Sequence, residues 1–419
     1  MSRLRIRNHG RIHAELQVQG SKNSSLPCLA AALLHPGITV LDGVPMIEDV
    51  FAAIEILRAL GARVSVEGSR VIICAHDVSG TEIPACFMRK MRSSVIFLGA
   101  LLSRMGEAQS VYPGGCALGS RPIDFHLEGF RRLGCEVVLS EEKIDVRSRG
   151  MSGALIRLPF SSVGATENLL LAAAGAQGMT VIENAAREPE IVELSRLLVR
   201  MGFDIRGAGT SCIAIRGKAD TKDVCFSMSG DRIVAGTWLL CCMNAGGRIC
   251  LDRVPVQWMY STLEVFRQMG AVIQTEGRRV ECRAPEKIRP VACLKTAPYP
   301  GFPTDMQSQL LPVLCRAEGD SCIRETVFAS RFRVAAQLAR MGADITVSAD
   351  QTFARIRGGS RLHGAEVSAP DLRGGAALVI AAMNAEGDTV IDDFYHIERG
   401  YERITDTIRI LGGEACWIV

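Results

Sequence analysis

The chain repeats one phrase six times, and this repeat limits the folds available to it more than any other feature. The phrase is the end of an apolar helix, then Leu or Met, then Gly, then a strand. Its glycines are Gly61, Gly134, Gly202, Gly270, Gly342 and Gly412, which lie 73, 68, 68, 72 and 70 residues apart by subtraction. A period near 70 residues exceeds that of common solenoids and predicts compact units grouped into domains rather than a linear stack.

A second glycine marker interleaves with the first at the same period. It follows an Ala- and Leu-rich helix and comprises Gly37, Gly106, Gly178, Gly247, Gly319 and Gly387. The two markers therefore predict the same order of elements in each mixed α/β unit: helix, Gly C-cap, strand, helix, Gly C-cap, strand. Segments such as residues 64–73 are expected to form β-hairpins. Apolar helices such as 24–34 and 167–176 carry almost no charge, so we expect them inside, with sheets around them.

Six units in 419 residues are too many for one ordinary core. We predict two domains of three units each, one over residues 22–229 and the other over 1–21 and 230–419, joined by two chain crossings. A functional cleft would then lie between the domains. Three domains of two units each are the alternative.

The composition excludes several classes of protein. Lys and Arg total 48 against 45 acidic residues, and a net charge of +3 is too small for a general nucleic-acid binder. The fifteen cysteines lie mostly in apolar runs without metal-ligand spacing, so we predict reduced thiols, no metal and no cofactor. No membrane span or signal peptide is recognisable, so we expect a cytoplasmic protein with no membrane partner.

A cysteine on a glycine-rich loop is the first candidate for chemistry. Cys116 follows Pro113-Gly114-Gly115, whose glycines let the backbone approach a ligand closely. Ser120 and Pro122 predict that a helix begins just beyond it. A thiol near a helix N-terminus and a guanidinium such as Arg121 suits nucleophilic or proton-transfer chemistry. A plain surface turn with a structural cysteine is the alternative.

Several cations stand at predicted helix starts. Lys22 and Asn23 precede one uncharged helix and Arg92 precedes another, and a cation at a helix N-terminus makes an anion site. Arg373 and Arg399 occupy equivalent turns in other units. Converging from two domains, these groups would clamp a phosphate or a carboxylate. The alternatives are a solvated lysine and a surface charge run.

Two further loops carry polar groups. Asp305 stands beside a helix start in a Pro/Gly-bounded loop, where it is either a helix cap or, among cations, a general base toward a hydroxyl. Residues 161–166 offer backbone N–H groups and hydroxyls to a phosphate, although they are too few for a P-loop.

Together these stretches resemble the UDP-N-acetylglucosamine 1-carboxyvinyltransferase family of enolpyruvyl transferases, within the EPSP synthase superfamily, over the whole chain. The most specific markers are residues 20–23, 89–92, 113–116, 121–124, 162–168, 183–190, 301–307 and 399–401. The resemblance implies a two-domain inside-out α/β barrel with three repeated units per domain. It implies enolpyruvyl transfer from phosphoenolpyruvate to the 3-hydroxyl of UDP-N-acetylglucosamine, with release of phosphate. That reaction is the first committed step of peptidoglycan synthesis, so cell-wall biogenesis, cell shape and division depend on it.

The resemblance also implies the roles of individual residues. Cys116 would donate a proton, carry a covalent phosphoenolpyruvate adduct and be the target of fosfomycin, while Asp305 would deprotonate the sugar hydroxyl. Lys22 and Arg399 complete the implied catalytic set. The implied phosphoenolpyruvate-binding residues are Lys22, Asn23, Arg92, Arg121, Arg373 and Arg399. The implied nucleotide-sugar residues are Arg92, Arg121, Pro122, Ile123, Asp124, Phe125, Phe160, Ser162, Val163, Gly164, Asp305 and Val327. Domain closure would exclude water, with the Cys116 loop as a lid.

Two stretches depart from the family pattern, which usually has Glu-Asn in place of Ala329-Ser330 and Glu in place of Val234. A divergent, weakly active or regulatory paralogue is therefore one alternative. Transfer to shikimate 3-phosphate is another, although that sister enzyme lacks the cysteine loop and commonly has Ser in place of Asn23. An RNA-end cyclase would need a catalytic histidine, and His396 belongs to the family's own pattern. Small-molecule substrates are the partners expected, and protein partners stay open.

Overall fold

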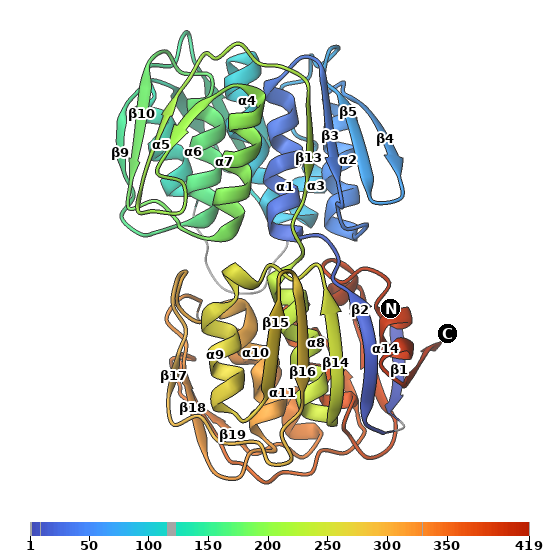
Figure 1. Cartoon of the computed structure of the whole chain (residues 1–419). Coiled ribbons are helices and arrows are strands. Elements are labelled where there is room, and N and C mark those ends of the chain that lie inside the picture. Colours follow the sequence, from blue (N-terminus) through green and yellow to red (C-terminus); the bar gives the residue numbers. More distant parts are fainter. Residues whose placement is uncertain (1, 9, 115–122, 329, 419) are drawn as a thin grey trace. The chain divides into compact units, whose positions relative to one another are not determined.

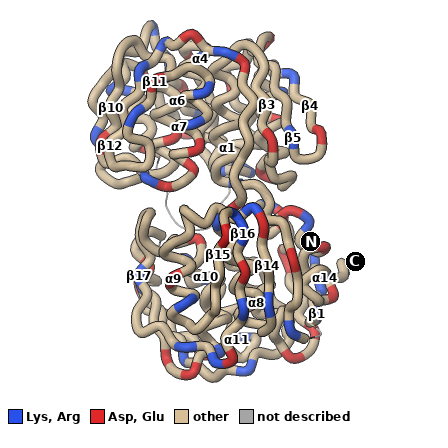
Figure 2. Tube along the Cα trace, in the orientation of Figure 1, with Lys and Arg blue, Asp and Glu red and all other residues tan. Residues whose placement is uncertain are grey.

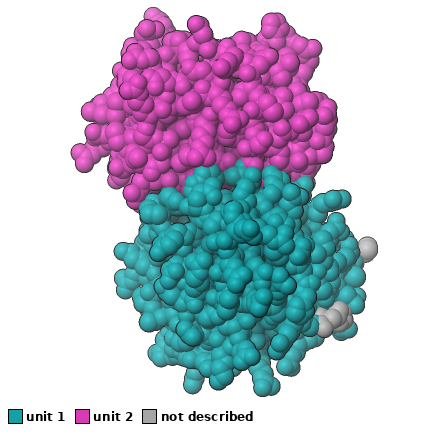
Figure 3. Space-filling model, viewed as in Figure 1, with its two compact units in different colours: residues 1–19, 117–119, 229–419 teal, residues 20–116, 120–228 magenta. Residues whose placement is uncertain are grey.

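The computed structural model describes residues 2–8, 10–114, 123–328 and 330–418. Contacts along the chain divide it into two compact units, which have different colours in Figure 3. Unit 1 contains the described residues of 1–19 and 229–419, and unit 2 contains those of 20–116 and 120–228. Each unit has three sheets, and none of the six sheets formed by the described residues closes on itself.

The sheets of unit 2 combine short parallel and antiparallel pairs. Their strand orders are β13 (Val224–Ser227), β3 (Ile38–Asp42), β5 (Arg70–Cys74), β4 (Arg63–Glu67); β6 (Glu107–Val111), β8 (Lys143–Arg147), β7 (Glu136–Leu139); and β11 (Asp204–Arg206), β12 (Cys212–Arg216), β10 (Met179–Glu183), β9 (Leu155–Arg157). The antiparallel pair β4 and β5 confirms the hairpin predicted over 64–73.

The sheets of unit 1 are built in the same way. Their strand orders are β21 (Glu366–Ser368), β22 (Thr389–Asp392), β1 (Arg3–Asn8), β23 (Gly413–Ile418); β15 (Val272–Glu276), β16 (Arg279–Arg283), β14 (Gly247–Asp252), β2 (Ile12–Gln17); and β17 (Leu294–Lys295), β18 (Ser321–Arg324), β20 (Phe353–Ile356), β19 (Ile345–Val347). β1 pairs with β23 and β2 pairs with β14, so the N-terminal segment completes sheets whose other strands lie far along the chain.

Six helices, which we call the inner helices, bury nearly every residue. They are α1 (Lys22–Ala31), α4 (Phe97–Met105) and α6 (Val163–Ala173) in unit 2, and α8 (Arg232–Ala245), α10 (Thr304–Leu314) and α12 (Leu372–Ala382) in unit 1. Within each unit they pack on one another and the strands lie outside them (Figure 1). The predicted arrangement of buried apolar helices surrounded by sheets is confirmed.

A second set of helices is amphipathic and buries one face. It comprises α2 (Glu48–Ala59), α5 (Asp124–Arg132), α7 (Pro189–Met201), α9 (Tyr260–Gln268), α11 (Val334–Arg340) and α14 (Ile404–Ile410). The short helices α3 (Ala85–Lys90), α13 (Tyr395–Glu398), η1 (Ala32–Leu34), η2 (Arg92–Ile96), η3 (Val256–Trp258) and η4 (Arg331–Arg333) complete the set. Many charged residues lie on the strands and connecting loops, as Figure 2 shows. Among the described residues, no helix combines the length and the hydropathy that a membrane span requires.

The glycines of the repeat end helices because they adopt backbone angles that other residues avoid. All six glycines of the first marker have positive φ values, between 91° and 121°. Gly37, in the second marker, is different: a Cβ built there would lie 2.2 Å from the Asp223 carboxylate. Gly37 is not among the glycines with positive φ, so the predicted C-cap role is wrong for it, and a larger residue there would displace the Asp223 and His35 side chains.

Candidate functional site

Three of the charged residues singled out in the sequence lie in the first turns of inner helices, whereas Arg399 follows the short helix α13, so the prediction that it occupies an equivalent turn is wrong. Lys22 is the first residue of α1, Asp305 is the second of α10, and Arg373 is the second of α12. The interior of these helices is packed in the core, where an ion would lose its hydration. The first turn has unpaired backbone N–H groups and can carry charged side chains.

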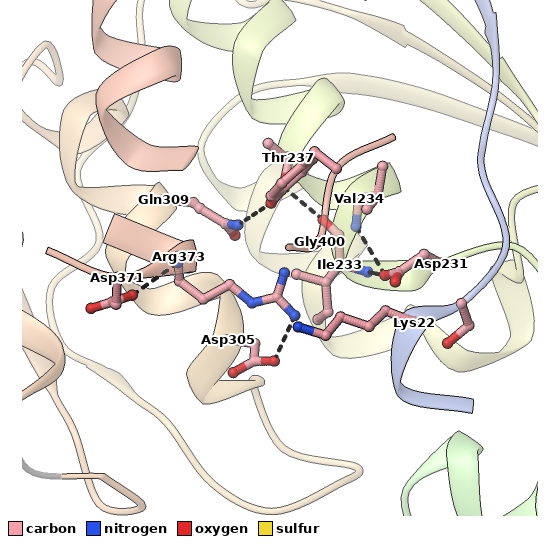
Figure 4. A network of polar contacts seen from close by, with 12 residues as sticks. Lys22, Asp231, Ile233, Val234, Thr237, Asp305, Gln309, Asp371, Arg373 and Gly400 are labelled. Carbon is pink, nitrogen blue, oxygen red and sulfur yellow. Dashed lines mark hydrogen bonds and ion pairs between the residues drawn. The ribbon is translucent and has the colours of Figure 1, made fainter. Parts of the chain in front are cut away.

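In unit 1, two arginines hold one carboxylate. The guanidinium of Arg331 donates to Oδ1 of Asp305, and that of Arg373 donates to Oδ2 at 2.9 Å. Both arginine side chains are about 95% buried, since 4% and 5% of their surface is exposed, while 23% of the Asp305 side chain is exposed. Figure 4 shows Arg373 extending from the start of α12 to Asp305. The carboxylate therefore stays reachable while both of its cations are covered.

The two arginines determine the ionisation of Asp305. Burial by itself would raise the pKa of Asp305, but the charges of Arg373 and Arg331 outweigh it and hold that pKa far below 3.8. Asp305 in turn raises the pKa of Arg373 against the effect of burial. The residue is thus a carboxylate at neutral and mildly acidic pH. It is not a helix cap, because Pro303 occupies that position of α10, so the capping alternative is wrong.

Hydrogen bonds to Tyr401 join the second turns of α8 and α10 in unit 1, and aspartates cap the starts of α8 and α12 (Figure 4). The Tyr401 hydroxyl lies 2.8 Å from both the Thr237 hydroxyl of α8 and the Gln309 amide of α10. Asp231 and Asp371 cap α8 and α12 by accepting from backbone N–H groups. Burial raises the pKa of Tyr401 to about 12, so its hydroxyl stays protonated and able to donate. The Asp371 cap thus fixes the start of α12, which carries Arg373, and Tyr401 ties α10 to α8 one turn beyond Asp305.

Val234, one departure from the family pattern, lies inside this region. Its side chain is 1% exposed within the core of unit 1, and its N–H donates to Asp231 at 3.1 Å. A valine is accommodated there without an unpaired buried charge.

Arg331 was not predicted as a site residue from the sequence. Its segment was considered only because Ala329 and Ser330 depart from the family pattern. Ala329 lies outside the described residues. Ser330 precedes η4 and has φ 74°, a left-handed conformation that suits Gly or Asn better than Ser. The turn at Ser330 leads directly into Arg331, whose guanidinium reaches Asp305.

We predict that Ser330→Asn stabilises the protein by a few tenths of a kcal/mol, whereas Ser330→Val destabilises it by about 1–2 kcal/mol. Asn tolerates the left-handed conformation and a β-branched residue does not. Urea unfolding of both variants measures the two changes. A stabilising valine would contradict the explanation.

Glu325 organises the segment that contains Val327, a predicted nucleotide-sugar residue. It is 3% exposed and accepts from the Thr296 and Thr304 hydroxyls, each at 2.9 Å. It also accepts from the Val327 N–H at 2.7 Å. One carboxylate thus connects the end of β17, the start of α10 and the Val327 segment, a role that nothing in the sequence indicated.

In unit 2, Lys22 lies against an acid that the sequence did not single out. Its Nζ lies 2.7 Å from Oδ2 of Asp49 in α2, and 11% and 3% of the two side chains are exposed. Ser21 caps α1 by accepting from the Ser24 N–H. The solvated-lysine alternative is wrong, because Lys22 is buried at a capped helix start. Asn23 and Arg92 are partly exposed at their own helix starts.

Residues 123–125 and 162–164 were both predicted to bind the nucleotide sugar. The two segments lie close together, and a buried histidine connects the helices that carry them. Nδ1 of His126 in α5 lies 2.9 Å from the Asn168 amide nitrogen of α6. The Asn168 carbonyl accepts from Gly99 N–H at 2.7 Å, so its amide nitrogen is the donor and His126 Nδ1 is the acceptor. A Cβ built at Gly164 would lie 3.7 Å from His126 Nε2. That distance is an ordinary van der Waals contact, so α6 begins directly beside this ring, behind its Ser162 cap.

Burial, with a smaller contribution from the charge of Arg92, lowers the pKa of His126 from 6.5 to about 4. The unfolded chain therefore binds a proton in the window between about pH 6.5 and 4 that the folded chain does not. Stability is full above this window and falls by up to about 3 kcal/mol as the pH drops through it. We predict that His126→Gln flattens this part of the profile, which urea unfolding at pH 7, 5.5 and 4.5 measures. An unchanged slope would contradict the assignment of a buried neutral imidazole.

The remaining predicted residues are dispersed or not described. Phe160 is 44% exposed, Ile123 is buried, Asp124 is exposed and Phe125 is partly buried. Arg399 ends α13 and is partly exposed. Cys116, Arg121 and Pro122 lie outside the described residues. In the described part of the chain, no group of three or more His, Cys, Asp or Glu residues is placed to hold a metal ion.

Comparisons with known proteins agree on one family. The sequence matches the family described as EPSP synthase (3-phosphoshikimate 1-carboxyvinyltransferase) over residues 6–408. It is 42% identical over 414 residues to UDP-N-acetylglucosamine 1-carboxyvinyltransferase 2 of Caldanaerobacter subterraneus subsp. tengcongensis, covering 99% of each chain. It is 44% identical over 408 residues to UDP-N-acetylglucosamine 1-carboxyvinyltransferase 1 of Symbiobacterium thermophilum, covering 96% of this chain and 92% of that one.

Two solved structures share the fold. The enolpyruvyl transferase NikO from Streptomyces tendae superposes with a TM-score of 0.90 at 24% identity, covering 99% of both chains. EPSP synthase from Acinetobacter baumannii superposes with a TM-score of 0.79 at 18% identity over the full length of both. At these identities the likeness concerns the fold alone, which confirms the predicted EPSP synthase-like architecture.

Proposed function

The chain belongs to the EPSP synthase family, and we propose that it transfers the enolpyruvyl group of phosphoenolpyruvate to the 3-hydroxyl of UDP-N-acetylglucosamine, releasing phosphate. The full-length identity to relatives that carry this activity in their names is the observation that supports it most directly. A transferase of this kind acts in peptidoglycan synthesis. A cytoplasmic location, where both substrates are made, is part of the proposal.

Asp305 is the proposed base. As the sugar oxygen attacks C2 of phosphoenolpyruvate, the hydroxyl proton passes to a carboxylate within hydrogen-bond reach. Arg331 and Arg373 keep Asp305 ionised before the substrate arrives. Arg373 is also a proposed ligand of phosphoenolpyruvate, so substrate binding would loosen its bond to Asp305. The carboxylate would then become more basic in the complex than in the free protein.

The proposed cations neutralise the second substrate. Phosphoenolpyruvate carries a phosphate and a carboxylate, and Lys22, Arg121 and Arg399 are proposed to bind them with Asn23 and Arg92. The tetrahedral intermediate keeps both anions, so cations that are already positioned lower its energy. When phosphate leaves C2, the C3 proton that was gained is lost again and the double bond returns.

Cys116 is the proposed donor of the proton that C3 gains. We propose that the catalytic domains, residues 22–229 and residues 1–21 with 230–419, bring the Cys116 loop and Asp305 to one set of substrates. The nucleotide sugar would contact residues 121–125, Phe160 and residues 162–164, together with Arg92, Asp305 and Val327. The closeness of residues 123–125 to α6 supports a single binding region for these two stretches.

A phosphate-release assay with paired substrates tests the proposed function. Phosphate should appear only when UDP-N-acetylglucosamine and phosphoenolpyruvate are both supplied. Release with shikimate 3-phosphate in place of the nucleotide sugar would overturn the choice of acceptor. Absence of release with either acceptor would favour the regulatory paralogue.

Cys116→Asp should retain phosphate release yet resist alkylation by fosfomycin, because a carboxylic acid donates a proton but is a poor nucleophile toward an epoxide. The intact mass after incubation with fosfomycin measures the alkylation. If Cys116→Asp gains the adduct as readily as the unchanged chain, another of the fifteen thiols is the reactive one.

A further inference from the structure

Two cysteines of unit 1 lie side by side on one sheet, outside the proposed site. Leu294 and Ile323 are paired between the parallel strands β17 and β18, and Cys293 and Cys322 each precede one member of that pair. The Cys322 Sγ lies 2.8 Å from the Ala292 carbonyl, so this thiol leans toward the neighbouring strand. The Cys293 thiol is near enough to contribute to the raised pKa of Cys322.

Both thiols lie on the outer face of the sheet. Leu294 and Ile323 are buried, whereas Cys293 is exposed and Cys322 is partly exposed, as the alternation of a strand requires. β17 is the edge strand of its sheet. A small molecule in solution can therefore reach Cys293 without any unfolding.

The strand geometry suits a covalent bond between the two residues. Adjacent strands lie about 4.8 Å apart, and disulfides join Cα atoms about 4.4–6.8 Å apart. Side chains at neighbouring positions of a parallel pair point to the same face. All cysteines in the described ranges are free thiols, so this bond is not present in the structure.

The surroundings of the pair are basic. Lys295 and Arg324 are the next outward-facing residues on β17 and β18, and Arg355 is the partner of Cys322 on β20. Arg355 is 2.7 Å from Asp320, which offsets part of this charge. Cations favour a thiolate and attract an anionic thiol reagent.

We propose that Cys293 and Cys322 form a reversible disulfide by exchange with a low-molecular-weight disulfide that carries carboxylates, such as oxidised glutathione. The Cys293 thiolate attacks the reagent, forming a mixed disulfide and releasing one reagent thiolate. The Cys322 thiolate then attacks the Cys293 sulfur and displaces the second reagent thiolate. Two protons leave the protein, its two thiols are oxidised, and one reagent disulfide is reduced to two thiols.

The two thiols have distinct roles in this exchange. Burial, together with the hydrogen bond to Cys293, raises the pKa of Cys322 to about 11. Cys322 is therefore the slower nucleophile and the exposed Cys293 reacts first. Once Cys293 is in a mixed disulfide, its negative charge no longer opposes ionisation of Cys322, and the second step becomes easier.

The disulfide between Cys293 and Cys322 would close a covalent loop of the chain that contains Asp305, the proposed base. Cys293 and Cys322 are 29 positions apart by subtraction, and Asp305 and the whole of α10 lie between them. Cross-linking restricts the unfolded chain and so stabilises the folded unit. The disulfide would thus strengthen the support of Asp305 without touching its side chain.

Disulfide mapping tests the proposed bond directly. The full chain is exposed to oxidised and reduced glutathione, the remaining thiols are alkylated, and the tryptic peptides are identified by mass spectrometry. The two cysteines fall in separate tryptic peptides, 288–295 and 317–324. We expect these peptides linked, with the loss of two hydrogen atoms, and a higher midpoint of thermal unfolding than in the reduced protein. Excess reduced glutathione should reverse both changes.

Single substitutions supply the controls. In Cys322→Ser, Cys293 should keep glutathione as a mixed disulfide, and in Cys293→Ser the link should be absent. Cys86→Ser, which removes an exposed thiol of α3 in unit 2, should leave the link unaffected. The proposal is overturned if the unchanged chain accumulates the mixed disulfide at Cys293 as much as Cys322→Ser does, or if Cys293 links to another cysteine. Neither readout depends on the proposed catalytic activity, so each idea can fail alone.

Discussion

Asp305→Asn should lower kcat for phosphate release by about 10²–10⁴-fold, the range expected when a general base is removed. The amide has nearly the same shape but cannot accept the hydroxyl proton. It also leaves the guanidinium groups of Arg331 and Arg373 without a countercharge, so the free energy of unfolding should fall as well. Steady-state kinetics with both substrates varied separates the loss in kcat from any change in KM.

Asp320→Asn is the matched control for this experiment. Asp320 is an acid of the same unit whose partner, Arg355, is mostly exposed, and neither lies near α10's first turn. This variant should keep kcat within about twofold, since exposed ion pairs contribute little to stability. If Asp305→Asn retained half of the activity while remaining folded, Asp305 would not be the base.

Arg331→Gln should move the acidic limb of the kcat profile upward by about 1–3 pH units. Arg331 and Arg373 together hold the pKa of Asp305 far below its usual value, and removing one cation relaxes this effect. The base then loses its charge at a higher pH, so activity disappears earlier on acidification. Because the folded pKa of Asp305 is the lowered one, its contribution to stability is present above about pH 4 and is lost as the pH falls.

Arg331→Lys is the informative partner of that substitution. Lysine keeps one positive charge but not the planar fork, so the acidic limb should shift less than in Arg331→Gln. A merely structural role for Arg331 would lower stability in both variants without moving the limb. Rate profiles extended down to the lowest pH at which each variant remains folded, with urea unfolding recorded at the same pH values, distinguish the two roles.

The repeat made most of the fold predictable, because its signals are local. A Leu or Met followed by Gly reports a helix end and a left-handed residue, and both are properties of neighbouring positions. The uncharged helices were recognisable as buried for the same reason. The C-cap role of Gly37 was predicted wrongly, because the space available to a side chain there is limited by Asp223, which is distant in the sequence.

The candidate site was predictable only in part. Lys22, Asp305 and Arg373 stand beside helix starts, which sequence patterns reveal. Sequence patterns do not reveal their partners. Asp49 and Arg331 lie in ordinary charged or apolar contexts, and they become meaningful only once folding places Asp49 2.7 Å from Lys22 and pairs Arg331 with Asp305. Such pairings depend on which helices are neighbours, and composition and periodicity contain no information about that.

Most charged residues of the inner helices lie in the first turns, with Arg104 near the end of α4 and Glu167 in the second turn of α6 as exceptions. In the proposed site, the first turns of α1, α10 and α12 carry the residues that meet the substrates, whereas the rest of each helix is constrained by packing. Proteins that share 18–24% of their residues with this chain keep its architecture and carry different names. In the proposed site, the starts of α10 and α12 are therefore the places at which to alter substrate contacts, because the packed interior of these helices would stay unchanged.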